Sequence, residues 1–287
     1  MSDDAWSEIA ELWSELWGQL PAPIWRVVLD AGGISRGAKV LDVGCGAGDF
    51  VAYARSVGLD AFGVDPAPGM VEVADRKLTA EPEGLRSKLD ISAAFVRGPK
   101  AFEGMPETSA TGPGALAAQP GFSAGAIRLA EAEHLLWPDD TFHLVTAFNS
   151  VQFAGDTDAA LFEMIRVTLP GGHVAVANWA ERDLNEVDSV ERALDDEPPG
   201  PDGDLRVAGG LEELFGDCGL TVVASGLVEM PWEVPDEAAL VRGILLGEEP
   251  ALAPEVTAAA LPYRNESGGY RFVNHFRFAV GRKSAGS

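Results

Sequence analysis

The stretch that decides the fold runs from Val40 to Phe50 and has the sequence Val-Leu-Asp-Val-Gly-Cys-Gly-Ala-Gly-Asp-Phe. Its first residues have the pattern of a buried strand, and Gly44, Gly46 and Gly48 follow at alternate positions. Glycine lets the backbone turn tightly and approach a ligand closely, because it has no Cβ. Free N–H groups at the start of the next helix favour a carboxylate, a phosphate or nucleoside atoms. The stretch therefore predicts a strand, a glycine turn and a helix that bind a nucleotide-like cofactor.

The glycine spacing argues against NAD. A dinucleotide-binding loop has the order Gly-x-Gly-x-x-Gly/Ala, in which the third small residue packs the helix onto the strand. Counting from Gly44 and Gly46 places Asp49 at that position. The order from Asp42 onward, Asp-x-Gly-x-Gly-x-Gly, instead resembles the first motif of class I S-adenosylmethionine (SAM)-dependent methyltransferases. The resemblance implies that four residues lie at the amino-acid part of SAM: Asp42, Gly44, Cys45 and Gly46.

A second motif follows at the expected distance. The apolar segment 61–65 predicts the next strand, and its last residue, Asp65, lies about twenty residues beyond the glycines, where a parallel sheet brings a carboxylate to a ribose diol. The run Gly-Val-Asp-Pro-x-Pro-Gly-Met, which ends at Met70, resembles the second methyltransferase motif. This resemblance implies that Pro66 lies beside the cofactor and that Met70 faces the adenine edge.

The third motif lies between Ile127 and Val145. It resembles the family pattern Gly-Asp-Ala-Glu-x-Leu-Pro-Phe-x-Asp-x-x-Phe-Asp-x-Val, which implies that Glu131 and Ala132 bind the adenine. The chain departs from the pattern at three positions: Glu131 replaces aspartate, Leu136 replaces proline and His143 replaces aspartate.

A fourth strand is predicted at 145–148, a helix at about 158–169 and a fifth strand at 173–179, after a Pro-Gly-Gly turn. The resemblance therefore covers about residues 38–180. It implies that Asn149 and Ser150 lie at the amino group of the cofactor, although turn and capping roles explain these side chains equally well. Four further residues are candidates for substrate binding: Gln152, Phe153, Asn178 and Trp179.

Length and element order together predict one α/β domain. Strands alternate with helices along the 287 residues, which is typical of a doubly wound sheet. The family resemblance implies a mostly parallel seven-stranded sheet with helices on both faces and an antiparallel last strand, predicted at 270–280. We expect an amphipathic helical cap over residues 1–30 and a SAM-binding domain over 31–287.

The N-terminal cap has an apolar stripe at helical spacing, with acidic residues elsewhere on the helix. Similar helices of small-molecule methyltransferases lie over the cofactor opening, so Trp13 and Trp17 are expected to close the site and to contact the substrate. Plain packing on the sheet is the alternative, and both interpretations predict burial.

Three additional segments interrupt the predicted alternation of strands and helices. The insertion 79–125 is rich in small and turn-forming residues, and we expect it on the face opposite the cofactor, where it is dispensable for cofactor binding. The resemblance implies that segments 181–211 and 235–269 cover the substrate, with two helices in the second.

Composition limits the partners and the compartment. The chain has 21 basic and 45 acidic side chains, and the net charge of −24 repels nucleic acids and anionic membrane surfaces. The two cysteines provide neither a disulfide framework nor a metal-binding spacing, which fits a reducing cytoplasm. The sequence has no stretch of eighteen apolar residues and no signal-peptide pattern at its start, so a cytoplasmic, soluble protein is expected. A homodimer is left open.

Methyl transfer from a sulfonium is an in-line displacement that needs alignment, desolvation and removal of a proton. His134 follows the third strand on the cofactor side and is the candidate general base, ahead of His275 in the last strand; His143 and His173 lie at the remote strand ends and are expected to be structural. The sequence thus predicts a SAM-dependent methyltransferase that acts on an oxygen or nitrogen of a small molecule in specialised metabolism. The alternatives are a SAM-binding protein of the same fold that catalyses another reaction, such as a cyclisation, and a binding module, which three retained cofactor segments disfavour.

Overall fold

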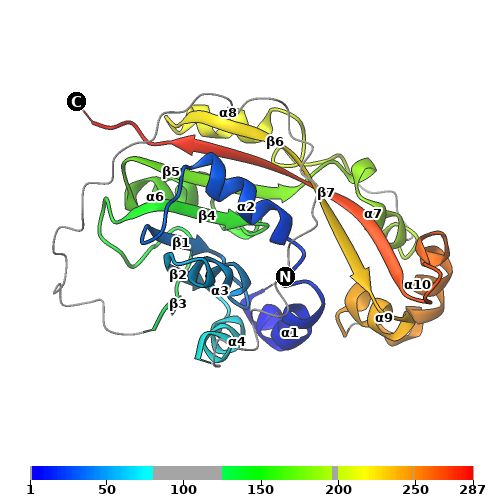
Figure 1. Cartoon of the computed structure of the whole chain (residues 1–287). Helices are drawn as coiled ribbons and strands as arrows, with labels where there is room; N and C mark the ends of the chain where they lie inside the picture. Colours follow the sequence, from blue (N-terminus) through cyan, green and yellow to red (C-terminus); the bar gives the residue numbers. More distant parts are fainter. Residues whose placement is uncertain (1, 80–124, 196–199, 248, 287) are drawn as a thin grey trace.

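The computed structural model describes residues 2–79, 125–195, 200–247 and 249–286. Its described part forms one seven-stranded sheet in the order β3-β2-β1-β4-β5-β7-β6 (Figure 1). The predicted insertion 79–125 lies outside the described residues, apart from its two ends. The strands are β1 (Lys39–Val43), β2 (Asp60–Asp65), β3 (Ile127–Leu129), β4 (Phe142–Phe148), β5 (Thr168–Trp179), β6 (Thr221–Val234) and β7 (Tyr270–Arg282).

Strands β3, β2, β1, β4 and β5 pair in parallel, whereas β7 runs antiparallel to both β5 and β6. Alternate side chains of the strands enter two separate apolar cores, with Val40 and Leu144 in one and Leu41 and Val145 in the other. Helices α2 (Ala22–Ala31) and α3 (Asp49–Ser56) cover the first core, while α6 (Thr157–Val167) and α8 (Gly210–Asp217) cover the second (Figure 1). The predicted doubly wound fold with an antiparallel last strand is confirmed.

The β6–β7 ribbon extends beyond the rest of the sheet. Trp179, the last residue of β5, pairs with Phe276, but β7 continues back to Tyr270 and remains paired there with Val234 of β6. Helices α7 (Glu186–Glu191), α9 (Glu237–Leu245) and α10 (Ala253–Ala260) gather along this overhang (Figure 1). The two helices predicted within 235–269 are therefore confirmed. The sequence analysis did not locate β6, the longest strand.

The N-terminal segment contains two helices with different neighbours. Helix α1 (Asp3–Leu16) packs against α4 (Pro68–Thr79), where Gly69 lies close to the backbone of Ser7. Ion pairs join Glu11 to Arg76 on α4 and Glu15 to Arg242 on α9. Helix α1 thus bridges the sheet domain and the overhang.

The chain turns after α1, at Gly18 and before Pro21, and α2 then packs on the sheet itself. The apolar stripe predicted as one helix is therefore divided. Trp17 lies in the turn, stacks on Trp232 with ring centroids 4.1 Å apart, and donates its indole N–H to the carbonyl oxygen of Gly243 at 2.9 Å.

We predict that Trp17→Ala lowers the free energy of unfolding by about 3–5 kcal/mol, because the ring is only 6% exposed and the substitution leaves a large cavity. Trp13→Ala is the matched control, since Trp13 is only partly buried and its loss should cost less. Urea unfolding of both variants checks this prediction. Equal losses would contradict the assignment of Trp17 to the core.

Candidate functional site

A cavity of about 370 Å³ lies at the carboxyl ends of β1, β2 and β4. Parallel strands of a doubly wound sheet bind ligands at this edge. All eleven residues predicted to bind the cofactor line the cavity, although they are spread over more than a hundred positions of the chain: Asp42, Gly44, Cys45, Gly46, Asp65, Pro66, Met70, Glu131, Ala132, Asn149 and Ser150.

The glycine turn forms the floor of this cavity. Gly44 has a φ of +67°, and a Cβ there would lie 2.4 Å from the Cβ of Ser150, so only glycine allows the two turns to meet. Gly46 has a φ of +51° and no atom within 4 Å of the position where a Cβ would stand. The backbone at Gly46 is therefore free for close approach by a ligand.

Two buried carboxyl groups lie beside this turn. Asp65 accepts backbone hydrogen bonds from Gly46 at 2.8 Å and Ala67 at 3.0 Å, while Asp42 accepts one from the hydroxyl of Thr146 at 2.7 Å. Burial raises the pKa of Asp65 to about 6 and that of Asp42 to about 8, in each case against the opposing effect of the hydrogen bonds. Both groups hold a negative charge poorly in this site, so a cationic ligand nearby would favour their ionised form.

The charged side chains in the described wall of this cavity are all acidic. Among the described lining residues there is no lysine, arginine or histidine. Burial and the neighbouring carboxylates also raise the pKa of the Cys45 thiol, which keeps it neutral. The acidic side chains of the lining number six: Asp3, Asp42, Asp49, Asp65, Glu131 and Glu133.

Asp49 is a carboxylate of this wall that is held by a lysine. Its oxygens contact the Nζ of Lys77 and the amide nitrogen of Gln19, each at 2.6 Å, and Lys77 also donates to Ser14. These contacts join α3 and α4 to the end of α1, so they position the helix that covers the cavity.

Aromatic side chains form the other end of the cavity. Trp6 meets the rings of Trp13 and Phe153 edge to face, with centroids 5.0 Å and 5.6 Å apart, and Phe153 remains 53% exposed at the opening. Trp13 and Trp17 also line the cavity, while their closing of the site and their contact with a substrate stay predictions. Gln152 is not part of the lining and instead donates to the side-chain oxygen of Asn149.

The sequence analysis missed Trp25 and Phe276. Both line the cavity, and the indole nitrogen of Trp25 is buried without a hydrogen-bond partner among the described residues. Trp25 belongs to α2, which the helical pattern did not separate from α1, whereas Phe276 comes from a distant strand and belongs to no motif. An isolated tryptophan in an amphipathic helix was the only available signal for Trp25.

A second cavity of about 140 Å³ adjoins the first, and both include Trp13 and Trp17 in their walls. It lies between α1, α7 and α9 and also contacts Trp179, one of the predicted substrate-binding residues. Asn178 lines neither of these two cavities. Its side chain is buried, 2% exposed, and has no hydrogen-bond partner within the described ranges.

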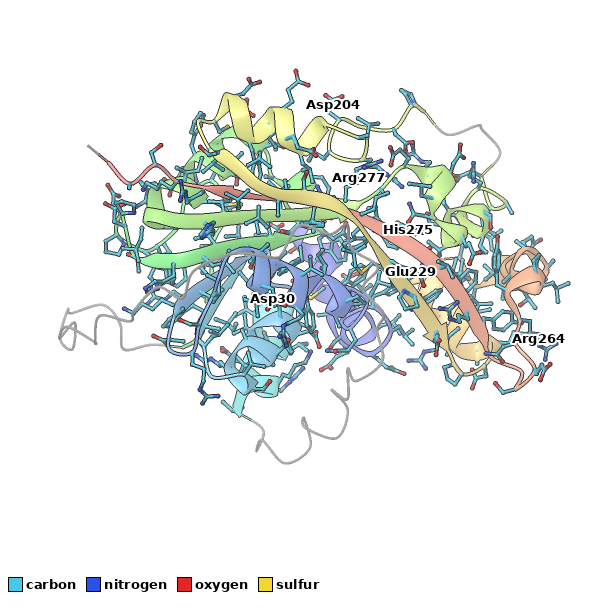
Figure 2. The ribbon with its side chains drawn as sticks, turned by 45° about the horizontal axis from the view of Figure 1, so that its top comes forward. Asp30, Asp204, Glu229, Arg264, His275 and Arg277 are labelled. Carbon is cyan, nitrogen blue, oxygen red and sulfur yellow. The ribbon has the colours of Figure 1, made fainter. Side chains whose placement is uncertain are left out.

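The histidines lie away from both cavities. His134 is exposed, and its Nδ1 lies 3.5 Å from Glu131, while the Nδ1 of His275 contacts the carbonyl oxygen of Leu184 at 2.8 Å. Figure 2 shows His275 beside Glu229 on the β6–β7 ribbon, whose register pairs these two residues. The Nδ1 of His143 accepts the backbone N–H of Lys39 at 3.0 Å and so joins β4 to β1. None of these three imidazoles lines the first cavity, although His134 contacts Glu131, which does.

Sequence comparison identifies the family. A model described as "Methyltransferase domain" matches residues 14–225, most of the chain. The chain belongs to this family. It is similar to Methyltransferase GfsG of Streptomyces halstedii, with 30% identity over 162 residues, which are 56% of this chain and 44% of that protein. The matched part thus spans less than half of this relative.

Solved structures show the same fold. The YcgJ protein of Bacillus subtilis has a TM-score of 0.52 at 16% identity, covering 91% of this chain and 98% of that one. The [4+2]-cyclase SpnF has a TM-score of 0.50 at 18% identity, covering 92% and 80%. At such identities the likeness concerns the fold alone, which is that of class I SAM-dependent methyltransferases, as predicted.

The described residues contain neither a membrane-spanning helix nor a cluster of metal-binding side chains. None of the helices in those ranges is both long and apolar enough to cross a membrane. The same ranges contain no group of three or more histidine, cysteine or acidic side chains placed to hold a metal ion.

We predict that Asp42→Asn stabilises the protein more at pH 8 than at pH 5. The folded-state pKa of Asp42 is raised to about 8, so its stabilising contribution is complete below about pH 4 and is lost as the pH rises toward 8. The gain from asparagine should therefore grow by roughly 2–4 kcal/mol across this range. Urea unfolding at several pH values measures it, with the exposed Asp60→Asn as control. A gain that is independent of pH would show that Asp42 is ionised throughout.

Proposed function

We propose that the protein binds SAM in the first cavity and transfers its methyl group to an oxygen or nitrogen of a small molecule. The main support is the acidic, cation-free lining of the described cavity wall. SAM has a net positive charge from its sulfonium and ammonium groups, whereas the pyrophosphate of NAD is anionic. Such a wall favours the first ligand and repels the second.

Residues on the cavity wall fit the parts of SAM. Asp65, Met70 and Ala132 all line the cavity; Asp65 would accept hydrogen bonds from the ribose diol, and Met70 and Ala132 would pack on the adenine. The unpartnered indole N–H of Trp25 offers a donor to the cofactor carboxylate, which would satisfy a buried group that otherwise costs free energy. Bound SAM would supply an activated methyl group on its sulfonium.

The protein contributes alignment and exclusion of water. Trp6, Trp13 and Phe153 crowd the opening of the cavity, and Trp17 is fixed behind them by its stack and hydrogen bond. Aromatic faces attract a sulfonium, and a dry cavity strengthens the alignment that displacement requires. Only carboxylates of the described lining are available to take the proton of the methyl acceptor, because no imidazole or amine is present there.

The proposed acceptor is small because the cavities are enclosed by α1 and the overhang, and because a net charge of −24 disfavours nucleic acids. Specialised metabolism rests on the resemblance to small-molecule methyltransferases alone. Cytoplasmic location stays a prediction of the same kind.

One observation favours the alternative, a SAM-binding protein that catalyses a reaction without methyl transfer. The described cavity wall lacks the histidine or lysine that would serve as general base for an oxygen or nitrogen nucleophile. Release of S-adenosylhomocysteine in step with product distinguishes the two functions. Product formation without it would establish the alternative.

We predict that SAM and S-adenosylhomocysteine bind and that NAD does not. Asp65→Ala should weaken SAM binding by roughly 1–3 kcal/mol, because hydrogen bonds from the diol to a charged acceptor are lost. Asp60→Ala, at the opposite end of the same strand, is the matched control and should leave affinity unchanged. Calorimetry with each ligand decides the matter, and NAD binding as tight as SAM binding would refute the assignment.

A further inference from the structure

The second cavity differs from the first in its charge. Its wall combines Trp13, Trp17 and Trp179 with apolar residues of α7 and α9, and its charged residues are Arg206, Asp188 and Glu191. Arg206 lines this cavity and not the first, which has no cation in its described wall. The two cavities share Trp13 and Trp17, so a molecule in the second lies next to the aromatic end of the first.

The guanidinium of Arg206 is only partly satisfied by the protein. Its Nε donates to the carbonyl oxygen of Ala180 at 2.9 Å and lies 3.6 Å from a carboxylate oxygen of Asp202. Neither Nη1 nor Nη2 donates a hydrogen bond to any described residue. The side chain is 24% exposed, and burial together with the positive charge of Arg182 lowers the pKa of Arg206. A partly buried cation with two unused donor groups is a good site for a planar anion.

Three carboxylates, those of Asp202, Asp188 and Glu191, interact electrostatically with Arg206, and among the described residues only Asp202 forms an ion pair with it, at Nε rather than at the Nη atoms. Asp188 lines the same cavity and forms ion pairs with Arg182 at 3.5 Å and with Arg192 at 2.7 Å, but its Oδ2 is buried without a hydrogen-bond partner in the described ranges. Glu191 also lines the cavity and interacts electrostatically with Arg206, but no ion pair joins these two side chains within the described ranges.

We propose that the second cavity binds the methyl acceptor and that this acceptor has a carboxylate held by the Nη atoms of Arg206. The apolar body of the acceptor would pack on Val187, Ile244 and the ring of Trp179. Arg206 does not line the first cavity, so the carboxylate that it holds is not the group that is methylated. The nucleophile of the acceptor lies at the end of the second cavity that is formed by Trp13 and Trp17. This inference rests on the proposed function and adds the class of substrate.

The test compares phenylacetate with its neutral analogue phenylacetamide as probes, titrated by calorimetry into the full chain saturated with S-adenosylhomocysteine. We expect phenylacetate to bind at least about tenfold more tightly, as a charge-assisted pair allows. Arg206→Gln should abolish this preference. Arg206→Lys, which keeps the charge but loses the planar pair of donors, should retain part of it.

Controls separate the possible failures. Arg26→Gln removes an exposed arginine of α2 and should leave the preference unchanged, while thermal melting of each variant shows whether it folds. The proposal is overturned if wild-type protein shows no preference for the acid, if neither probe binds, or if Arg206→Gln keeps the preference. Failure of S-adenosylhomocysteine itself to bind would instead refute the proposed function, because that ligand tests the first cavity alone.

Discussion

The site depends on the hydrogen bond from the backbone N–H of Gly46 to the carboxylate of Asp65, 2.8 Å long. It joins the turn after β1 to the end of β2, and the second oxygen of Asp65 holds the backbone of Ala67 at the start of the next turn. Two loops that could diverge are thereby kept together. Burial disfavours the charged form of Asp65 and raises its pKa. A cation or a diol that binds Asp65 would favour the charged form and so strengthen its two backbone hydrogen bonds.

Helix α1 contacts the glycine turn as well as α4 and α9. Ala10 of α1 packs with Ala47 and Met70 on the glycine turn, and ion pairs from α1 reach both α4 and α9. One helix therefore forms a wall of the first cavity and a wall of the second.

Motif residues were predictable because their positions follow from local sequence. Asp42 and Asp65 lie at the ends of β1 and β2, and Met70 lies in the first turn of α4, the helix that follows β2. A parallel sheet brings such strand ends to one edge whatever the remainder of the chain does. The missed features depend on long-range pairing. Strand β6 alternates half-buried and exposed residues because it is an edge strand, so its sequence lacks a continuous apolar run. Arg206 comes from the segment between α7 and α8 and Phe276 from β7, and only long-range packing, which no local pattern indicates, brings them to the cavities. His134 follows β3 as predicted, but its ring lies at the surface beside Glu131 and lines neither cavity, so its role as general base stays a prediction.

A crystal structure of the protein with S-adenosylhomocysteine tests the central claim most directly. Our account predicts the ribose hydroxyls on Asp65, the adenine between Met70 and Ala132, and the sulfur facing Trp13 and Trp17. A ligand bound outside the first cavity, or one inside it with Asp65 turned away from the ribose, would contradict this account.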